Sequence, residues 1–474
     1  MNKKLLLVSI AGAGLGYLYL KTRTVIAQSS YNYTIYKNGD YTIGYNNKTK
    51  KEEFRNLDFS TLTQSVVDKL LVESYVNSGG NIFNILIKDG IYVAKQPITI
   101  PITPNSTPNP NVTFNVSGES LNTKIKLDAT SINNFPHKYV FQAFSPGTYQ
   151  KLFIDGSYRE MVNQPQDNGG LLYIGADNII VQDCLFNDSN YFKIFSYYGQ
   201  NNILIQRNKF EGAAGNDNIG GGRFNNLIVD NNIFNTTTSK WYAGTSLDTV
   251  GASNITFANN TTNTDIYLMM EGTNGAVIRN NTFNSVESNV FIQSDKYYNL
   301  ATPIENSKNI KVIDNQFTRG SYVIIKSNYA SGKTATECRD FEVSGNAFNG
   351  PQHTAIITVQ DNNANKVNNV LIKNNTITDN NSLGDATWNT GMGIIEPSGI
   401  NIAHGEYIIL ENNTIKDNRT IKRSIYGIQI GDVYDPNRYM SANHITIRNN
   451  TIAGYVKQAI NVANPQYSTD VVIS

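Results

Sequence analysis

Charged side chains recur at one point of a repeated apolar phrase in this chain. They stand at or just beyond the end of the second of two short apolar segments, and are Arg223, Asp248, Glu271, Asp295, Lys326, Asp361, His404 and Asp432. If these segments stack as strands, equivalent positions lie about 5 Å apart. Asp248 and Glu271 would then be near neighbours, either as the paired carboxylates of a glycosidase or as calcium ligands.

These positions also have a simpler interpretation, in which polar residues end apolar strands on a solvated face. In the functional interpretation Asp248 and Glu271 are catalytic, because two adjacent carboxylates raise the pKa of one and supply a general acid. The remaining residues of the groove would bind substrate: Arg223, Asp295, Lys326, Asp361 and His404. The sequence leaves both interpretations open.

Signatures of metal or cofactor chemistry are missing from the sequence. The histidines at 137, 353, 404 and 444 are scattered without the spacing of metal ligands. The sequence has no GxSxG elbow, P-loop or dinucleotide fingerprint. We therefore expect no cofactor and no bound metal.

A repeated phrase identifies the elements that would position the charged residues. Its frame is apolar, any, apolar, two variable residues, Asn, any, apolar, as in NILIQRNKF, NLIVDNNIF and NVLIKNNTI. Successive Asn slots are 21 to 38 residues apart, a pattern typical of one fixed coil with loops of variable length. The slot holds Cys184, then Asn208, Asn232, Asn260, Asn281, Asn315, Asn346, Asn375, Asn413 and Asn450.

Period-two alternation makes each phrase a β-strand, and a second apolar segment follows each one. Two or three strands in a coil of about 22 residues, without a helix, predict an all-β parallel β-helix, a solenoid. A β-sandwich with regular turns is the alternative. The Asn slots should be buried and bonded along the axis, because Asn tolerates the left-handed backbone of a bend and its amides stack. One inner column should contain Ile205, Val229, Phe257, Ile278, Val312, Val343, Ile372, Leu410 and Ile447.

The chain is expected to have three parts. Residues 1–28 form a signal peptide or membrane anchor, residues 29–112 an N-terminal cap region, and residues 113–474 the β-helix. The cap region contains a helix over 61–78 and the first strands. Thr61 and Gln64 form a capping box at the start of this helix, which would cover the open end of the core.

Residues 1–28 have the organisation of a targeting segment. Lysines precede an uncharged apolar run at 5–20, and basic residues follow the run directly. Cleavage after Val25-Ile26-Ala27 would secrete the chain, whereas retention would anchor it in a membrane through residues 5–20. About 20 residues normally span a bilayer. Both outcomes predict an extracellular, cell-surface or virion-surface location.

Composition limits the possible partners. With 39 basic and 38 acidic residues the net charge is +1, so no field attracts nucleic acid. A surface of uncharged polar residues suits carbohydrate, and the Asn-X-Ser/Thr sequons could carry glycans in a secreted protein. The two cysteines, Cys184 and Cys338, should lie roughly 29 Å apart at the usual strand spacing. A disulfide requires a much shorter distance.

The order of these features resembles that of the pectate-lyase-like right-handed parallel β-helix superfamily. The resemblance rests on the N-terminal helix, Gly-Gly, an alternating strand, DGIY, a loop, FIDG at 153–156 and NNxF-type coils, and it covers roughly residues 60–474. It implies the fold of polysaccharide lyases, polygalacturonase-like hydrolases and phage tailspikes. Of the polygalacturonase-like signature, only Asn263-Thr264-Asp265 is present. The missing paired Asp, GHG and RIK put that activity in doubt.

Two classes of function follow from the resemblance and the residues. The first is a secreted or surface-displayed adhesin, or a viral attachment protein, that binds a polysaccharide or cell-surface glycan and forms homo-oligomers as tailspikes do. The alternative is a secreted polysaccharide lyase or glycoside hydrolase acting through the groove carboxylates. The missing signatures favour the adhesin. Sugar rings would pack on aromatic side chains beside the groove: Tyr191, Tyr197, Tyr198, Trp241, Tyr242, Tyr297, Tyr298 and Tyr329.

Overall fold

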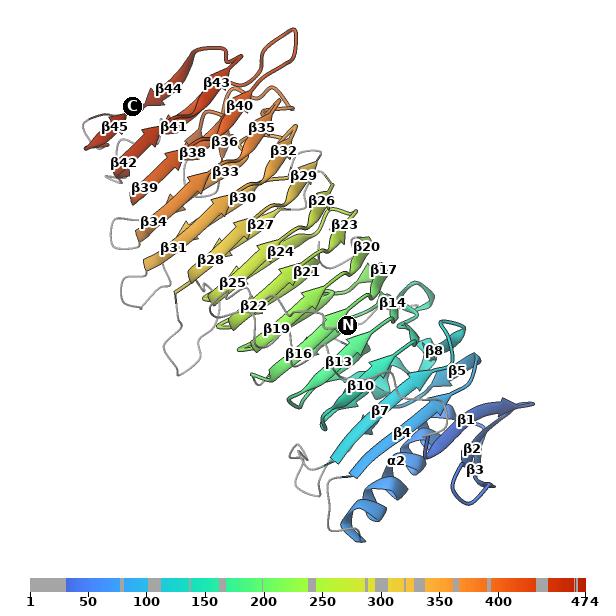
Figure 1. Ribbon diagram of the computed structural model, residues 1–474. Helices are drawn as coiled ribbons and strands as arrows, with labels where there is room; N and C mark the ends of the chain where they lie inside the picture. The colour runs from blue at the N-terminus through green and yellow to red at the C-terminus, as the bar shows by residue number, and fades with distance from the viewer. Residues whose placement is uncertain are drawn as a thin grey trace, which may run out of the picture.

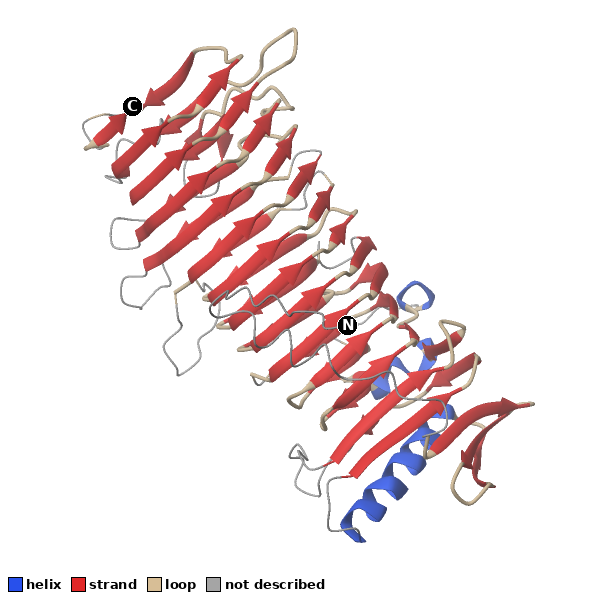
Figure 2. Cartoon of the chain, in the orientation of Figure 1, coloured by secondary structure: helices blue, strands red, loops and turns tan. Residues whose placement is uncertain are grey.

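The protein is a long rod of stacked coils, with a long helix at the N-terminal end of the rod (Figures 1 and 2). The computed structural model describes residues 31–76, 81–100, 112–135, 138–161, 168–197, 199–237, 244–285, 289–294, 306–318, 321–327, 337–360, 366–389, 394–431, 442–463, 465 and 468–474. The expected targeting segment lies outside these residues. In the described part of the chain, no helix is long and apolar enough to cross a membrane.

Three long sheets, here called A, B and C, run along the rod. The strands of sheet A are β1 (Tyr33–Asn38), β2 (Tyr41–Asn46), β3 (Lys51–Asn56), β4 (Asn81–Ile87), β7 (Val112–Gly118), β10 (Gly147–Gln150), β13 (Ile179–Gln182), β16 (Asn201–Gln206), β19 (Asn225–Asp230), β22 (Ser253–Ala258), β25 (Asn274–Arg279), β28 (Lys308–Ile313), β31 (Glu337–Ser344), β34 (Lys366–Lys373), β39 (Gly405–Glu411), β42 (Ala442–Arg448) and β45 (Val471–Ile473).

Sheet B contains shorter strands, each directly after the bend that ends a strand of sheet A. They are β5 (Gly90–Ala94), β8 (Thr123–Leu127), β11 (Phe153–Asp155), β14 (Leu185–Ser189), β17 (Lys209–Ala214), β20 (Ile233–Thr237), β23 (Thr261–Thr262), β26 (Thr282–Asn284), β29 (Gln316–Thr318), β32 (Ala347–Asn349), β35 (Thr376–Thr378), β40 (Thr414–Lys416) and β43 (Thr451–Ala453).

Sheet C completes each coil. Its strands are β6 (Ile98–Ile100), β9 (Tyr139–Ala143), β12 (Gly170–Ile174), β15 (Ile194–Ser196), β18 (Ile219–Gly222), β21 (Thr245–Val250), β24 (Tyr267–Glu271), β27 (Val290–Gln293), β30 (Val323–Ser327), β33 (Ile356–Gln360), β38 (Ser398–Ile402), β41 (Tyr426–Ile430) and β44 (Gln458–Val462). Short elements lie between coils: β36 (Trp388–Asn389), β37 (Ile394–Ile395), and the 3₁₀ turns η2 (Ala129–Asn134) and η3 (Tyr158–Glu160). Apart from the N-terminal hairpin, every pairing within these three sheets is parallel, which confirms the expected β-helix.

The predicted inner column of sheet A is confirmed. Its nine members, from Ile205 to Ile447, pair in unbroken register from β16 to β42. All nine are buried in one continuous apolar core. Truncating such a side chain leaves a cavity, at a cost of about 2–5 kcal/mol for Ile372→Ala.

The Asn slots form the expected ladder between sheets A and B. Each amide nitrogen donates to the side-chain oxygen of the next slot, as Asn232 does to Asn260 at 3.0 Å and Asn375 to Asn413 at 2.9 Å. The assumption that the slot itself takes the left-handed backbone was wrong. That conformation belongs to the preceding residue, such as Asn231 or Asn374, which leaves the slot residue free to aim its amide along the axis.

The N-terminal end of the core is covered by α2 (Phe59–Val76) and by the hairpin strands β1–β3, whose first strand extends sheet A beside β4. The predicted capping box was wrong in position. Asp58 caps the helix, accepting bonds from the amides of Ser60 and Thr61 at 3.2 and 3.3 Å. Gln64 instead ties α2 to β6 through the backbone of Thr99. The first coil is already formed by β4, β5 and β6, which pair with β7, β8 and β9.

Both cysteines are buried free thiols, as expected. Cys184 occupies the first position of the ladder, and its backbone amide donates to Asn208 at 2.9 Å. Burial raises the pKa of the Cys184 thiol to about 12 and that of Cys338 to about 11. Both are therefore structural thiols in the unreactive protonated form.

Candidate functional site on the outer face of sheet C

Asp248 and Glu271 both point to the outer face of sheet C. Successive side chains of a strand point to opposite sides, and the alternating Leu247, Leu268 and Met270 belong to the core. Asp248 is half-buried, whereas Glu271 is buried. The two catalytic candidates therefore share one face, as the sequence predicted.

The register does not make them direct neighbours. Asp248 pairs with Met269, and Glu271 pairs with Val250, so the two carboxylates are diagonal across adjacent strands, with Cα atoms roughly 8 Å apart. The expected alignment was displaced by two residues, because Glu271 ends its strand whereas β21 continues for two residues after Asp248. The amide of Gln293 donates to the Glu271 carboxylate from the next strand.

The proposed substrate-binding residues are distributed over several columns. Lys326 follows Gln293 in the column of Glu271. Gly222 is the residue of β18 that lies in the column of Glu271. Arg223, the next residue, is exposed and has a left-handed backbone conformation. His404 is buried, and its Nδ1 accepts a bond from the amide of Gln360 at 3.2 Å, so it supports the strand end. Asp295, Asp361 and Asp432 lie outside the described residues.

Asp217, in the turn before β18, is a further carboxyl at this face that was not among the predicted site residues. A Cβ placed on Gly220 would lie 3.4 Å from the Oδ2 atom of Asp217. Gly220 pairs with Asp248 on the next strand, about 5 Å away at strand spacing. The Asp217 carboxyl therefore occupies the outer face beside Asp248, within roughly 8 Å of its Cβ atom by these two distances. Nothing in the repeat marks this position, because Asp217 lies in a turn outside the repeated phrase.

Asp217 has the properties of a general acid. Its exposed fraction is 7%, and burial raises the pKa of its carboxyl to about 6, opposed only in part by the neighbouring Thr245. The ring of Phe192 fills the space over Gly220 and shields the carboxyl from water, since a Cβ there would lie 2.5 Å from the ring. A carboxyl with this pKa keeps its proton in mildly acidic solution and can donate it to a substrate.

Seven aromatic side chains cover the outer face of the coils that precede Asp217. We call them the aromatic cluster: Tyr139, Phe144, Tyr173, Tyr191, Phe192, Phe195 and Tyr197. Phe192 and Phe195 stack with ring centroids 4.3 Å apart. Tyr197 is 51% exposed, so the cluster presents an aromatic ring to solvent. Of the tyrosines expected beside the groove, Tyr191 and Tyr197 lie here, and the other aromatic candidates lie outside the described residues.

A buried lysine braces the turn that carries Asp217. Lys193 donates through Nζ to the carbonyl of Glu211 at 2.6 Å and to Thr236 Oγ1 at 3.1 Å. Thr236 in turn donates to Asn218, the residue after Asp217, at 2.6 Å. Burial lowers the pKa of Lys193 to about 7. Its role is to position the turn, because its ammonium is directed into the coil.

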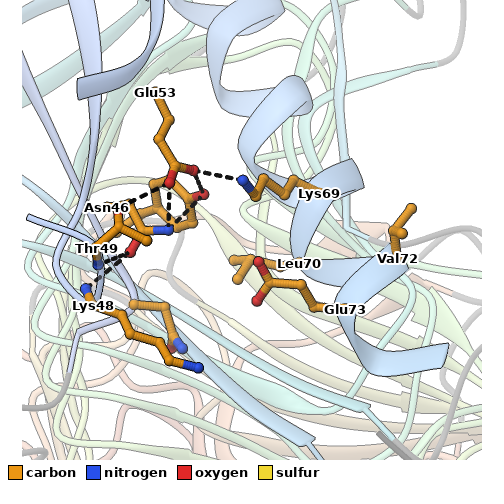
Figure 3. A pocket seen from close by; sticks show the side chains of 10 residues that line it. Asn46, Lys48, Thr49, Glu53, Lys69, Leu70, Val72 and Glu73 are labelled. Carbon is orange, nitrogen blue, oxygen red and sulfur yellow. Dashed lines mark hydrogen bonds and ion pairs between the residues drawn. The ribbon is translucent and has the colours of Figure 1, made fainter. Parts of the chain in front are cut away.

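A second polar site lies at the N-terminal end, between the β1–β3 hairpin and α2 (Figure 3). It is a hollow of about 330 Å³ lined by Asn46, Glu53, Lys69 and their neighbours. Figure 3 shows the Glu53 carboxylate between Asn46 and Lys69, from which it accepts bonds at 3.0 and 2.7 Å. It also accepts a bond from the hydroxyl of Tyr33. The Glu53 carboxylate accepts hydrogen bonds from several neighbouring side chains. We therefore interpret this site as one that holds the hairpin against α2 rather than as a reaction site.

Among the described residues, no three His, Cys, Asp or Glu side chains lie close enough together to hold a metal ion. Asn263-Thr264-Asp265 lies in the turn between β23 and β24, where Asp265 is exposed and accepts a bond from Ser285. That arrangement fits turn chemistry.

Comparisons with known proteins identify the fold but no close relative. No protein-family model and no curated protein matches the chain. The catalytic domain of a GH87 alpha-1,3-glucanase in complex with nigerose has a TM-score of 0.53 at 13% identity, covering 87% of this chain and 66% of that one. The catalytic unit of the GH87 alpha-1,3-glucanase from Streptomyces thermodiastaticus strain HF3-3 has a TM-score of 0.51 at 14% identity, covering 85% and 67%. The A-module of the Azotobacter vinelandii mannuronan C-5 epimerase AlgE4 has a TM-score of 0.46 at 15% identity, covering 88% and 96%.

Proposed function

Because the chain has the right-handed parallel β-helix fold of the pectate-lyase-like superfamily, we propose that it binds a polysaccharide along the outer face of sheet C and hydrolyses its glycosidic bonds. The observation that carries this proposal is the position of the buried Asp217 carboxyl, whose pKa is raised to about 6 by burial, between the aromatic cluster and Asp248. An adhesin needs sugar-binding surfaces but no carboxyl whose proton is retained near pH 6.

The aromatic cluster would hold the sugar chain. Tyrosine and phenylalanine rings offer flat apolar faces to the C–H groups of sugars, and tyrosines add polar tips. Tyr197 is the most exposed member of the cluster. A chain that runs along the rod over Phe195 of the cluster reaches the Asp217 carboxyl on the next coil, because Phe195 pairs with Gly220, over which that carboxyl lies.

Asp217 and Asp248 would divide the chemistry. Asp217 donates its proton to the glycosidic oxygen as the C1–O bond breaks, and the departing chain leaves as an alcohol. Asp248 is the second carboxylate. It either removes a proton from the attacking water or bonds to C1 until water displaces it, and the separation of the two carboxyls decides which. Glu271, held by Gln293, and Lys326 would bind sugar hydroxyls on the far side.

Hydrolysis is testable with a panel of soluble α-1,3-glucan, polygalacturonate, alginate and xylan, by release of reducing ends. The first substrate is included because two of the structural neighbours are named as α-1,3-glucanases. We expect turnover of one member and its loss in Asp217→Asn, with glycan binding retained. The matched control is Asp183→Asn, which changes an exposed carboxylate on the sheet A side, paired with Arg207.

The adhesin remains the second candidate, and the exposed aromatic ring of Tyr197 favours it, because aromatic platforms bind sugars without any reaction. In that case the same panel would show binding that depends on Tyr197 and no product with any substrate. Display outside the cell, by secretion or through an anchor at residues 5–20, belongs to either candidate. Fluorescence microscopy of the tagged full chain, with protease added to intact cells, would test it.

A further inference from the structure

The outer face of sheet C changes from open to closed along the rod. Near the aromatic cluster Tyr197 is 51% exposed, and Asp248, Met269 and Phe291 are still half-buried. Further on, in β33, Ile357 and Val359 have no exposed surface although both point outward. Another part of the chain must therefore lie on the sheet there.

The covering segment is the described part of the connection between β35 and β38, residues 379–389 and 394–397, which we call the wall loop. Its described part includes the hairpin strands β36 and β37. Ile395 of β37 is fully buried in a small apolar cluster outside the main core, packed with Ile324, Ile357, Val359 and Ala403. Ile395 of the wall loop therefore lies against the outer face of β30 and β33 and against the residue that follows β38.

The wall loop lies across the continuation of the catalytic columns. The column of Asp248 continues through Met269, Phe291 and Ile324 to Ile357. The column of Glu271 continues through Gln293 and Lys326 to Val359. Both columns thus end beneath Ile395. From the strand of Asp248 to that of Ile324 is three strand spacings, roughly 14 Å, which is room for a short oligosaccharide.

The start of the wall loop is held by the next coil. Asp417 accepts bonds from Arg419 at 2.6 Å and from the amide of Arg423 at 2.7 Å. Arg419 also donates to the carbonyl of Asn380 at 2.6 Å, and Asn381 donates to the carbonyl of Arg423 at 2.8 Å. Each loop thus donates a bond to a carbonyl of the other. The bond from the guanidinium of Arg419 is charge-assisted and therefore strong.

The end of the wall loop is held by a second set of contacts. The carboxylate of Glu396, directly after Ile395, accepts a bond from Tyr426 at 2.9 Å and pairs with Lys457. Glu396 is itself buried. The described start and end of the loop are therefore both held by hydrogen bonds, and Ile395 near its end is packed on the sheet.

We propose that the groove accepts only the end of a glycan chain, because the wall loop closes it three strands beyond Asp248. A chain interior would have to pass through the space that Ile395 and its neighbours occupy. A chain end, in contrast, can enter over the aromatic cluster and stop at the wall. This inference rests on the proposed binding of glycan along sheet C, but it does not require that the glycan be cleaved.

Binding of labelled oligosaccharides to the Asp217→Asn variant tests the proposal without turnover. The probes are linear α-1,3-glucan, alginate and polygalacturonate oligosaccharides in three forms: free, with a bulky fluorophore at the reducing end, and with a bulky group at the non-reducing end. We expect one of the two end-modified forms to bind at least tenfold more weakly than the free form. Equal affinity of all three forms would show that the groove is open at both ends and would overturn the proposal.

Loosening the wall should remove this discrimination. In Arg419→Met the guanidinium bonds to the carbonyls of Asn380 and Asn381 are lost, and we expect the blocked form to regain affinity while the free form binds as before. The unchanged affinity for the free form shows that the variant is folded. Lys416→Met, an exposed change on the same coil, should leave the discrimination intact. Failure of every oligosaccharide to bind would overturn the proposed function itself, an outcome distinct from equal binding of all three forms.

Discussion

Two acidic side chains of this protein lose contact with solvent with opposite consequences: Glu53 in the cap is half-buried, and Asp217 in the groove is buried. Burial would raise the pKa of Glu53, yet bonds from Lys69, Tyr33, Asn46 and Thr49 outweigh burial and lower the pKa to about 2. Asp217 has an apolar ring beside it, and hydrogen bonds from Thr245 lower its pKa only in part. Burial therefore raises the pKa of Asp217 to about 6. The hydrogen-bond donors around a carboxyl decide whether burial makes it a permanent anion or a proton donor.

That difference separates a structural carboxyl from a reactive one. Glu53 joins the N-terminal hairpin to α2 through Lys69 and stabilises the end of the rod. Asp217 contributes little to the fold and is costly to leave ionised. Asp417 of the wall belongs with Glu53, because the guanidinium of Arg419 and backbone amides hold its pKa well below the usual range despite burial.

The largest expected effect is on turnover. Asp217→Asn should reduce the rate constant of hydrolysis by about 10²- to 10⁴-fold, the usual contribution of a general acid. In the unmodified protein the rate should fall as the pH rises above about 6, because Asp217 then loses its proton. Initial rates between pH 4 and 8 check both statements. Glu53→Gln should leave the profile unchanged, and a loss of turnover in Glu53→Gln would erase the distinction between the two carboxyls.

The same two variants should shift stability in opposite directions. Asp217 retains its proton in the folded state up to about pH 6, whereas its ordinary value is 3.8. The folded protein therefore loses stability as pH rises between these values, and Asp217→Asn should restore on the order of 2–3 kcal/mol above pH 6. Urea unfolding at pH 4 and pH 7.5 measures the difference, with no gain expected at the lower pH. A destabilised Asp217→Asn at pH 7.5 would mean that the carboxyl is structural.

Glu53→Gln should destabilise the cap by about 1–3 kcal/mol, because the buried hydroxyl of Tyr33 and the ammonium of Lys69 lose their charged acceptor. The pKa of Glu53 is lowered from 4.5 to about 2, so this contribution is complete above pH 4.5 and is lost as the pH falls towards 2. Thermal unfolding across that range checks it. Glu52→Gln provides the control, since Glu52 forms an exposed pair with Arg55 and its replacement should change stability little.

The smallest expected effect concerns sugar binding. Tyr197→Ala should weaken binding of the preferred oligosaccharide by about 1 kcal/mol, roughly fivefold, as one aromatic face is removed. Tyr407→Ala is the matched control, because Tyr407 is equally exposed but stacks on His444 on the sheet A side of the rod. Isothermal titration calorimetry compares the two. Equal losses in both variants would place the glycan elsewhere.

The fold could be predicted because a coil repeats its interactions. Each Asn slot such as Asn375 has to bond to a copy above and below, and each inner residue such as Ile372 has to pack on its copies. Because of both requirements, every coil has the same pattern of apolar residues and Asn in its sequence. The alternation of strand residues also predicted correctly that Asp248 and Glu271 share a face.

The site could be predicted only in part, because it does not repeat. The two-residue displacement between Asp248 and Glu271 depends on where each strand ends, which the phrase does not encode. Asp217 lies in a turn of unique sequence and reaches sheet C only because Gly220 has no side chain in the way. A run of three glycines on a strand, beginning three residues after an aspartate, is the sequence signal that could have drawn attention to it.

The most direct test of the account is the structure of the Asp217→Asn variant with a bound linear oligosaccharide from the panel. We predict sugar rings over the aromatic cluster, a glycosidic oxygen within hydrogen-bond distance of residue 217, Asp248 on the opposite side of the same sugar, and a chain end before Ile395. A ligand bound in the hollow beside Glu53, or along sheet A or B, with the outer face of sheet C empty, would contradict the account.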